Sequence, residues 1–332
     1  MNTIGIIANP ASGKDIRRLV SHATVVDNNE KVNIVKRIIL AAQSFGVDRI
    51  YIMPDTFLIG YKAAEDLRIS KELKTEVEIL NMNIKGNVTD TIRATEIMEQ
   101  KGVKCIVVLG GDGTNRAVAK AITNTPLIGI STGTNNVYPE MLEGTVVGMA
   151  AGVMATLGVC DMNKTCRKDK RIEIFKDGNM IDIALVDCVI SKQTYVGSKA
   201  IWNMEDIDMV IVSRAHPAAI GFSTIVGTSL IVTKDDDFGA LIHVNSGNKR
   251  VKAPIAAGTI GTITVDEPKV LKLNEPVYFN PNYNGIIALD GEREIPFKVG
   301  DNIVIKITRN GPYRVVVDRT LEFAQRNGFF ET

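Results

Sequence analysis

Residues typical of metal sites and disulfide frameworks are scarce in this sequence. It has three histidines and four cysteines, and no two cysteines form a Cys-x-x-Cys pair. His22, His216 and His243 are far apart, so the sequence gives no reason to expect a site built from histidine and cysteine ligands. Cys105 and Cys188 lie within apolar, strand-like runs, which predicts small core residues and a reduced, cytoplasmic compartment.

The sequence also lacks an excess of either charge and a long apolar run. With 39 basic and 38 acidic residues the net charge is +1, which gives no reason to expect nucleic acid or a membrane surface as a partner. The longest apolar stretch, Val146 to Val159, is too short to cross a bilayer and is rich in Gly and Ala, so we expect a packed helix. The first residues lack the basic start of a signal peptide and predict a strand instead.

The first half of the chain alternates apolar strands with amphipathic helices. The predicted strands are Ile4–Ala8, Arg49–Met53, Glu76–Asn81, Cys105–Leu109 and Leu127–Ile130, and the predicted helices are Lys31–Ser44, Phe57–Leu67, Val88–Lys101 and Asn115–Ile122. This alternation predicts a doubly wound parallel sheet. Ligands of such sheets bind beyond the carboxyl ends of the strands.

The pattern changes near residue 160. Strands are predicted at Lys170–Phe175 and Ile181–Ile190, with a hairpin turn at Asp177-Gly178, and short strands separated by Gly, Pro and Asn-Gly turns follow across residues 253–317. These features are typical of an antiparallel β domain. A last strand and helix are expected to return to the first domain. At 332 residues the chain is long enough for this division, which we place at 1–160, 161–312 and 313–332.

The most informative motif is Gly110-Gly111-Asp112-Gly113-Thr114, which follows an apolar strand and precedes a helical stretch. A strand, a glycine-rich turn and a helix start together offer backbone N–H groups to a phosphate. The acid at the apex points to phosphoryl transfer rather than simple dinucleotide binding. The alternative is an ordinary turn, in which the glycines supply positive φ and Thr114 caps the helix.

Two further loops follow predicted strands. Asn9-Pro10-Ala11-Ser12-Gly13-Lys14 is not a Walker A loop, because Ala8 replaces a required Gly and Asp15 a required Ser or Thr. Asn9, Ser12, Gly13 and Lys14 could still hold phosphate, with Lys14 as a point charge, although a plain turn is an equal alternative. The second loop contains Thr132, Gly133, Thr134, Asn135 and Asn136, whose hydroxyls and amides suit the phosphates or ribose of a nucleotide.

These motifs together resemble the superfamily of NAD kinases and diacylglycerol- or sphingosine-type lipid kinases. Within it, the ATP-NAD kinase-like branch that includes acetoin-catabolism protein X is the most similar. The resemblance covers nearly the whole chain. It implies a Rossmann-like first domain, a β-sandwich-like second domain, and a C-terminal strand and helix that return to the first.

The resemblance also implies roles for individual residues. In NAD kinases the motif's Asp activates the accepting ribose hydroxyl, which carries over to Asp112, while its glycines and Thr approach the phosphates. In lipid kinases a Glu in an Asp-Gly-Glu segment is the proposed base. Here that segment is Asp290-Gly291-Glu292, which from the residues alone is a hairpin tip with solvated charges.

Two departures concern the acceptor. NAD kinases carry an Asn-Glu pair in an apolar strand, where this chain has Val186 and Asp187. Val186 cannot make the hydrogen bonds of that Asn, and Asp187, our candidate acceptor-binding residue, is shorter than Glu. The kinase loop Thr-Pro-x-Gly-Ser-Thr-Ala-Tyr is reduced at best to residues 221–227. Losing polar contacts to a substrate weakens its recognition strongly.

The sequence thus predicts a kinase that uses ATP and Mg²⁺, with Asp112 and Glu292 as competing bases and no dedicated metal ligands. The acceptor would be NAD, a related nucleotide or a small metabolite, and the chain could form homo-oligomers. A nucleotide-binding accessory or sensor protein is one alternative, favoured by Val186 and Asp187. A lipid kinase is another, although no basic amphipathic stretch is present to hold a membrane. A dehydrogenase ranks last, because residues 110–114 lack the Gly-x-Gly-x-x-Gly spacing.

Overall fold

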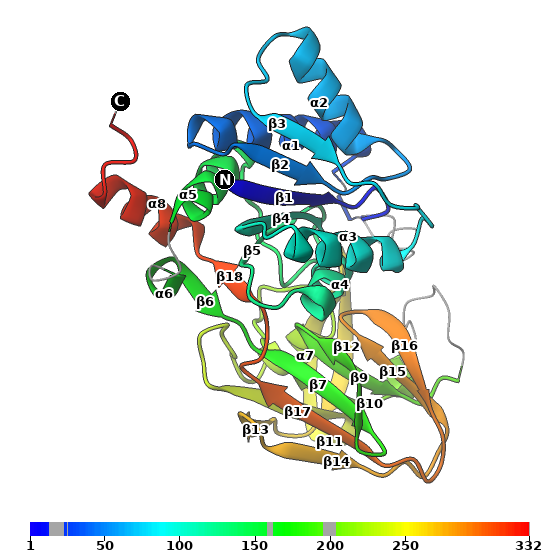
Figure 1. Ribbon diagram of the computed structural model, residues 1–332. Helices are drawn as coiled ribbons and strands as arrows, with labels where there is room; N and C mark the ends of the chain where they lie inside the picture. The colour runs from blue at the N-terminus through cyan, green and yellow to red at the C-terminus, as the bar shows by residue number, and fades with distance from the viewer. Residues whose placement is uncertain (13–22, 25, 158–161, 195–203, 332) are drawn as a thin grey trace.

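The structure is a computed structural model that describes residues 1–12, 23–24, 26–157, 162–194 and 204–331. It contains a seven-stranded sheet flanked by helices and, beyond it, two antiparallel sheets of seven and four strands (Figure 1). The first sheet is formed by the N-terminal half of the chain together with the C-terminal segment. The two antiparallel sheets are formed by the residues that lie between these two segments in the sequence.

The first sheet has the strand order β3-β2-β1-β4-β5-β18-β6. Its strands are β1 (Thr3–Ala8), β2 (Arg49–Ile52), β3 (Glu76–Ile79), β4 (Cys105–Gly110), β5 (Leu127–Ser131), β6 (Cys166–Lys168) and β18 (Tyr313–Val315). All neighbouring pairs are parallel except β18 and β6, which are antiparallel. The predicted doubly wound parallel sheet is therefore confirmed. The first five strands begin and end within two residues of the predicted positions.

Helices cover both faces of this sheet. One face carries α1 (Asn28–Ser44), α2 (Ile59–Ile69), α5 (Gly144–Thr156) and α8 (Val317–Arg326), and the other carries α3 (Val88–Gln100) and α4 (Asp112–Ala121). The alternation of side chains along β1 shows why: Ile4 and Ile6 pack in the core cluster of the first group, and Ile7 packs in that of the second. The short helix α6 (Met162–Thr165) packs on α8.

Helix α5 confirms the packed helix expected within residues 146–159. It lies directly on α1, and three glycines spaced four residues apart face that helix. A Cβ atom on Gly148 would lie 2.5 Å from the carbonyl oxygen of Ile38, and one on Gly152 would lie 2.5 Å from the Cβ of Phe45. Residues four apart share one helix face, so the glycines of this apolar run allow two helices to approach closely.

The antiparallel sheets form a sandwich. The larger has the order β12-β11-β10-β9-β15-β16, with β13 also on β11, and the smaller has the order β14-β17-β7-β8. The strands are β7 (Arg171–Lys176), β8 (Asn179–Ala184), β9 (Asp187–Ser191), β10 (Ile207–Val212), β11 (Phe238–Ala256), β12 (Thr259–Val265), β13 (Lys269–Lys272), β14 (Pro276–Phe279), β15 (Gly285–Leu289), β16 (Glu292–Phe297) and β17 (Ile303–Thr308). One core cluster joins the facing surfaces of the two sheets. A second lies under α7 (Ser223–Gly227), on the other face of the larger sheet; a short 3₁₀ helix, η3 (Met204–Asp206), precedes β10.

Two predicted elements were wrong in detail. The strand expected at Ile181–Ile190 is two strands in different sheets, because the chain turns a corner at Leu185 and Val186. The helix expected from Asn115 begins at Asp112, so Thr114 lies inside its first turn and is not its cap. Strand β11 has 19 residues, and only its last four lie in the stretch where short strands were predicted.

The C-terminal segment returns to the first sheet as predicted. Arg314 of β18 pairs with Leu127 of β5, and α8 packs on α5 (Figure 1). Strand β6 also joins the first sheet, so the chain crosses to the sandwich at residues 169–170. The domain limits at 160 and 312 stay predictions.

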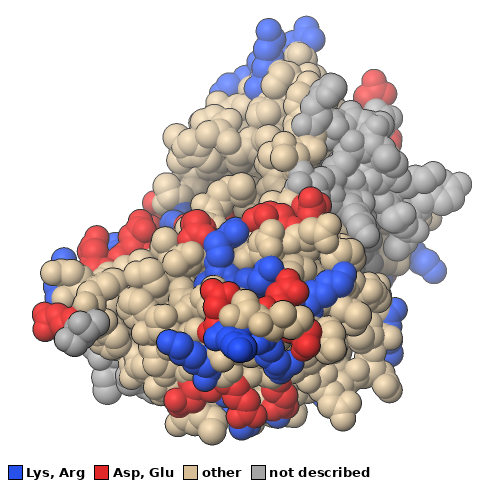
Figure 2. All heavy atoms as spheres, turned by 90° about the horizontal axis from the view of Figure 1, so that it is seen from above, with Lys and Arg blue, Asp and Glu red and all other residues tan. Residues whose placement is uncertain are grey.

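The visible surface carries charges of both signs. Figure 2 shows basic and acidic side chains intermixed on the face seen from above, in keeping with the net charge of +1. Within the described ranges, no helix is both long and apolar enough to span a membrane.

Candidate functional site

Three polar loops follow three adjacent strands of the first sheet. Ala8 at the end of β1 pairs with Leu109 of β4, and Gly110 at the end of β4 pairs with Ser131 of β5. The loops that follow therefore begin at the same edge of the sheet, as the sequence predicted.

The carboxylate of Asp112 is fixed by the loop that follows β5. Its Oδ1 accepts hydrogen bonds from the backbone N–H groups of Val137 (3.0 Å) and Tyr138 (2.8 Å), and its Oδ2 shares the Val137 donor at 3.1 Å. The residue is half-buried. These two amides hold the carboxylate at the start of α4.

The glycines of the motif serve close approach and not unusual backbone angles. Gly110, Gly111 and Gly113 are not among the residues with positive φ, so the ordinary-turn explanation of these glycines is wrong. A Cβ atom on Gly111 would lie 2.7 Å from Oδ1 of Asn136, and one on Gly113 would lie 2.6 Å from Oε1 of Glu292. Both distances are too short for a real Cβ atom.

Side-chain hydrogen bonds join the first loop to the other two. The Asn9 amide donates to Oγ1 of Thr114 at 2.9 Å. The Thr132 hydroxyl donates to Oγ of Ser12 at 3.0 Å, and the Ser12 hydroxyl in turn donates to the carbonyl oxygen of Asn9. The structure thus brings together predicted residues from three separate segments. Gly13 and Lys14, also predicted phosphate ligands, lie outside the described residues.

A buried lysine that sequence reasoning missed supports the first loop. Lys31 of α1 is 1% exposed, and its ammonium group donates to the carbonyl oxygens of Asn9 and Ser12 and to Oδ1 of Asn28. An ammonium group has three donors, so one lysine can bind all three of these acceptors. The only signal in the sequence was a lysine beside Val32 on the apolar face of a predicted helix.

The loop after β5 is ordered by its own side chains. The Asn136 amide donates to Oγ of Ser131 (2.8 Å) and to the carbonyl oxygen of Gly133 (3.2 Å). Thr134 is exposed and Asn135 half-buried, which leaves both accessible from solvent. The backbone of this loop also holds Asp112, so its order is coupled to the position of that carboxylate.

Glu292 reaches the motif from the sandwich. Asp290 and Gly291 form the predicted hairpin turn between β15 and β16, both with positive φ (51° and 82°). The turn places the Glu292 carboxylate against Gly113, as the Cβ distance shows. The Glu292 carboxylate, from a distant part of the sequence, therefore lies beside the residue that follows Asp112 at the start of α4.

Asp290 itself is not the solvated turn residue that the sequence indicated. Its side chain is fully buried and accepts hydrogen bonds from the backbone N–H groups of Leu185, Val186 and Asp187. These contacts stabilise the corner where β8 ends and β9 begins. Burial raises the pKa of Asp290, although Arg116 and the three amides oppose the shift.

The corner also explains the departure at Val186. Val186 is 1% exposed and packs in the core cluster that contains Val118 and Ala119 of α4. Val186, at the position where NAD kinases have Asn, thus packs in the contact between the sandwich and the first sheet. Asp187, the candidate acceptor-binding residue, is 6% exposed, and its backbone is held by Asp290.

Arg116 of α4, which we did not predict as a site residue, faces the sandwich. Its guanidinium group lies 3.5 Å from Oδ1 of Asp182, 3.9 Å from Oδ2 of Asp290 and 3.4 Å from Oε2 of Glu292. Its side chain is 3% exposed. A cation this deeply buried requires such partners.

A second buried network lies behind Tyr138, where the chain crosses between the two parts. Asp169 pairs with Arg314 through both carboxylate oxygens at 3.2 Å and lies 3.6 Å from Arg214, whose guanidinium stacks 4.7 Å from the Tyr138 ring. Next to it, Lys170 donates to two backbone carbonyl oxygens. Burial, reinforced by the neighbouring arginines, lowers the pKa of Lys170 to about 7.

The groups present could hold phosphate together with a metal ion that the phosphate brings. Among the described residues, no three His, Cys, Asp or Glu side chains gather to bind a metal. Mg²⁺ is commonly held by one or two carboxylates together with substrate phosphates, and Asp112 and Glu292 could supply these. Gly111, the N-cap residue of α4, has no side chain to cap the helix, so the first N–H groups of α4 suit a phosphate.

Comparison with known proteins places the chain in a family. Residues 4–158 match the family model described as the ATP-NAD kinase N-terminal domain, and residues 170–310 match the acetoin catabolism protein X C-terminal domain. Acetoin catabolism protein X from Cupriavidus necator is 39% identical over 314 residues, which cover 92% of this chain and 87% of that protein. The chain belongs to the acetoin catabolism protein X family. The resemblance inferred from the glycine-rich motif is confirmed.

This member of the acetoin catabolism protein X family has more distant relatives among the kinases. An NAD kinase from Methanosarcina barkeri is 23% identical over 228 residues, which cover 64% of this chain and 74% of that kinase. The solved structure of a candidate diacylglycerol kinase from Bacillus anthracis has a TM-score of 0.52 and 13% identity, covering 95% of this chain and 97% of that one. At this identity the similarity shows the fold alone. It confirms the α/β sheet domain followed by antiparallel sheets.

Proposed function

We propose that this protein is a phosphotransferase that moves a phosphoryl group from ATP to a hydroxyl group of NAD, a related nucleotide or a small metabolite. The observation that carries the proposal is the meeting of Glu292 with Gly113, beside Asp112, at the start of α4. Two carboxylates at the N-terminus of a helix combine a place for phosphate with groups that can accept a proton.

One group of residues would bind the phosphates. It consists of the first N–H groups of α4, the hydroxyls of Thr114 and Thr132, and the side chains of Asn9 and Ser12. Gly13, Lys14, Gly133, Thr134, Asn135 and Asn136 stay proposed members of the same group. Bound Mg²⁺ would neutralise charge on the phosphate oxygens.

Asp112 and Glu292 are the candidate bases. Asp112 is fixed by two backbone amides at the start of α4. Glu292 has a side chain that is 56% exposed and open to an incoming acceptor. A general base contributes roughly 10² to 10⁴ in rate, so whichever residue removes the proton should lose that much when replaced by its amide.

Burial of Val186 and Asp187 supports an acceptor bound differently from NAD in the kinases, with Asp187 at most at the edge of its site. The name of the Cupriavidus necator relative adds acetoin, a small hydroxyketone, to the acceptors worth testing.

The experiment measures ATP consumption and product formation with Mg²⁺ against NAD, NADH, nucleosides, diacylglycerol, small polyols and acetoin. Polyphosphate is tested as an alternative donor. Asp112→Asn and Glu292→Gln are assayed beside the wild type, and the variant that loses at least about 10²-fold identifies the base. Turnover on diacylglycerol alone would reassign the protein as a lipid kinase.

A nucleotide-binding accessory or sensor protein is the second candidate. The observation that favours it is the engagement of both Asp112 oxygens by the backbone, which gives that carboxylate a structural use. Calorimetry decides between the two. ATP binding without turnover of any acceptor on the panel would support the sensor and contradict the phosphotransferase.

A further inference from the structure

We propose that Arg116 is a positioning residue that holds Glu292 over the start of α4, and so completes the site when the sandwich and the first sheet are joined. The inference rests on the proposed function, because it gives Glu292 a role in phosphoryl transfer. It assigns a task to a residue outside the glycine-rich motif. It also explains how a hairpin tip can present a side chain reproducibly to a helix of another sheet.

Arg116 and the carboxylates that it contacts come from different parts of the fold. Arg116 lies on α4, three residues after Gly113, whereas Asp182, Asp290 and Glu292 all belong to the sandwich. Each of these carboxylates comes within 4 Å of the guanidinium group. One side chain thus connects the helix that carries the motif with β8 and with the β15–β16 hairpin.

Arg116 and Asp290 are buried, whereas Glu292 is exposed. The side chains of Arg116 and Asp290 are 3% and 0% exposed, whereas that of Glu292 is 56% exposed. Asp290 is immobilised by three backbone amides, and it lies two residues before Glu292 on the same hairpin. Arg116 therefore has a rigid anchor on one side and holds a more exposed carboxylate on the other.

The guanidinium group of Arg116 is suited to binding several carboxylates. A guanidinium group presents several donors in a fixed plane and stays charged at all working pH values. It can therefore hold several carboxylates at once, and it brings Glu292 close to Asp290 without leaving their charges uncompensated. A lysine would supply the charge but not the planar arrangement of several N–H donors.

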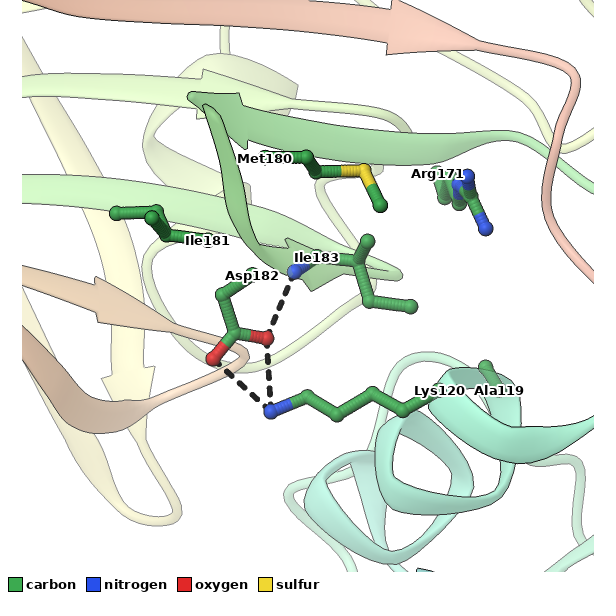
Figure 3. A pocket seen from close by; sticks show the side chains of 7 residues that line it. All are labelled: Ala119, Lys120, Arg171, Met180, Ile181, Asp182 and Ile183. Atoms are coloured by element: carbon green, nitrogen blue, oxygen red, sulfur yellow. Dashed lines mark hydrogen bonds and ion pairs between the residues drawn. The ribbon is translucent and has the colours of Figure 1, made fainter. Parts of the chain in front are cut away.

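A neighbouring residue provides a matched control. Lys120, one turn further along α4, pairs with the same Asp182 at 2.7 Å across the same boundary (Figure 3). It lines an open cavity of about 190 Å³ between α4 and the β7–β8 hairpin, together with Met180 and Ile183. No contact between Lys120 and Glu292 is found among the described residues. Replacing Lys120 removes a cation from the boundary without touching the candidate base.

The test compares Arg116→Gln, Arg116→Lys and Lys120→Gln, each alone and combined with Glu292→Gln, on the acceptor that the wild type turns over. We expect Arg116→Gln to lower kcat at least tenfold, with the KM for ATP changed less than threefold. Lys120→Gln should keep kcat within about twofold. In the Glu292→Gln background, Arg116→Gln should have no further effect, because a residue that acts only through Glu292 has nothing left to position.

Three outcomes would overturn the proposal: losses that add in the double variant, an equal loss in Lys120→Gln, or full activity in Arg116→Gln. If Arg116→Gln does not fold because Asp290 loses its cation, Arg116→Lys keeps the charge and carries the test, with a partial loss of kcat that again disappears without Glu292.

A crystallographic comparison separates this proposal from the proposed function. In Arg116→Gln or Arg116→Lys crystals we expect the Glu292 carboxylate to leave Gly113, and in Lys120→Gln crystals to stay. If the wild type phosphorylates no acceptor while Glu292 moves in this way, the kinase assignment fails and the positioning by Arg116 stands. If Glu292 keeps its place in both Arg116 variants, the positioning is wrong whatever the activity.

Discussion

The carboxylate of Glu292 occupies the space that a side chain on Gly113 would need, with Oε1 2.6 Å from the position of its Cβ. The two residues are 179 positions apart and belong to different sheets. The third glycine of the motif is therefore explained by a residue of the sandwich and not by the turn. The contact makes the motif dependent on the second half of the chain.

Gly113→Ala should separate activity from stability. The new methyl group meets only the end of a flexible side chain, and Ala is favoured over Gly in a helix by up to about 1 kcal/mol, so the free energy of unfolding should stay within about 1 kcal/mol of the wild type. Activity should fall roughly 10- to 100-fold, because Glu292 is displaced. Chemical denaturation and steady-state kinetics measure the two effects, and wild-type activity would contradict the role of the contact.

Gly148→Ala should have the opposite result. Its Cβ atom would meet the Ile38 carbonyl oxygen at 2.5 Å, and backbone cannot move aside as a side-chain end can. We expect a loss of about 1–3 kcal/mol in the free energy of unfolding, the usual cost of overpacking. Val146→Ala, at a more exposed position of the same helix, is the control. Equal stability of the two variants would show that α1 and α5 can separate without cost.

The pKa of Lys170 predicts a pH dependence of stability. Because burial lowers this pKa to about 7, below its ordinary value of 10.5, the folded state binds fewer protons than the unfolded state between these values. Stability should therefore rise with pH above about 7, by at most about 1.4 kcal/mol per pH unit, and the penalty should be fully present below 7.

Lys170→Met, which has no ammonium group to titrate, isolates this effect. The difference in unfolding free energy between wild type and variant, measured by urea denaturation from pH 6 to 9.5, should change in favour of the wild type as the pH rises. A difference that is constant across this range would show that Lys170 titrates alike in both states.

The Asp169–Arg314 pair should be important for stability. The two side chains are 1% and 7% exposed, so Asp169→Asn removes the nearer carboxylate from a buried guanidinium group, whose other partner, Glu140, is 3.9 Å away, and should cost about 3–5 kcal/mol. Asp66→Asn, which removes the exposed partner of Lys36, should cost no more than about 1 kcal/mol. Similar losses in the two variants, measured by denaturation, would contradict the assigned difference in burial.

The sequence predicted the loops of the site because their positions follow from local rules. Strands that end in Gly110 and Ser131 are recognisable from apolar runs, and parallel strands place their carboxyl ends at one edge. Glu292 was identified only through the resemblance to lipid kinases. From the residues alone, Asp290-Gly291-Glu292 was a solvated hairpin tip.

The residues that sequence reasoning missed depend on contacts between distant segments. Arg116 and Glu292 are 176 positions apart, and nothing near Arg116 indicates that it is buried. The break between β8 and β9 has the same origin, because the carboxylate that binds the amides of residues 185–187 comes from Asp290. Lys31 likewise was hidden as one charge in an amphipathic helix.

The place of β18 has a consequence for how the protein is made. This strand lies between β5 and β6 in the first sheet, yet it begins at residue 313 of 332. During synthesis the first five strands emerge early, but their sheet keeps an open edge beside β5 until the ribosome has translated the whole sandwich. The sandwich is therefore synthesised while the first sheet still lacks β18. The sheet that carries the glycine-rich motif can be completed only after the sandwich has been translated.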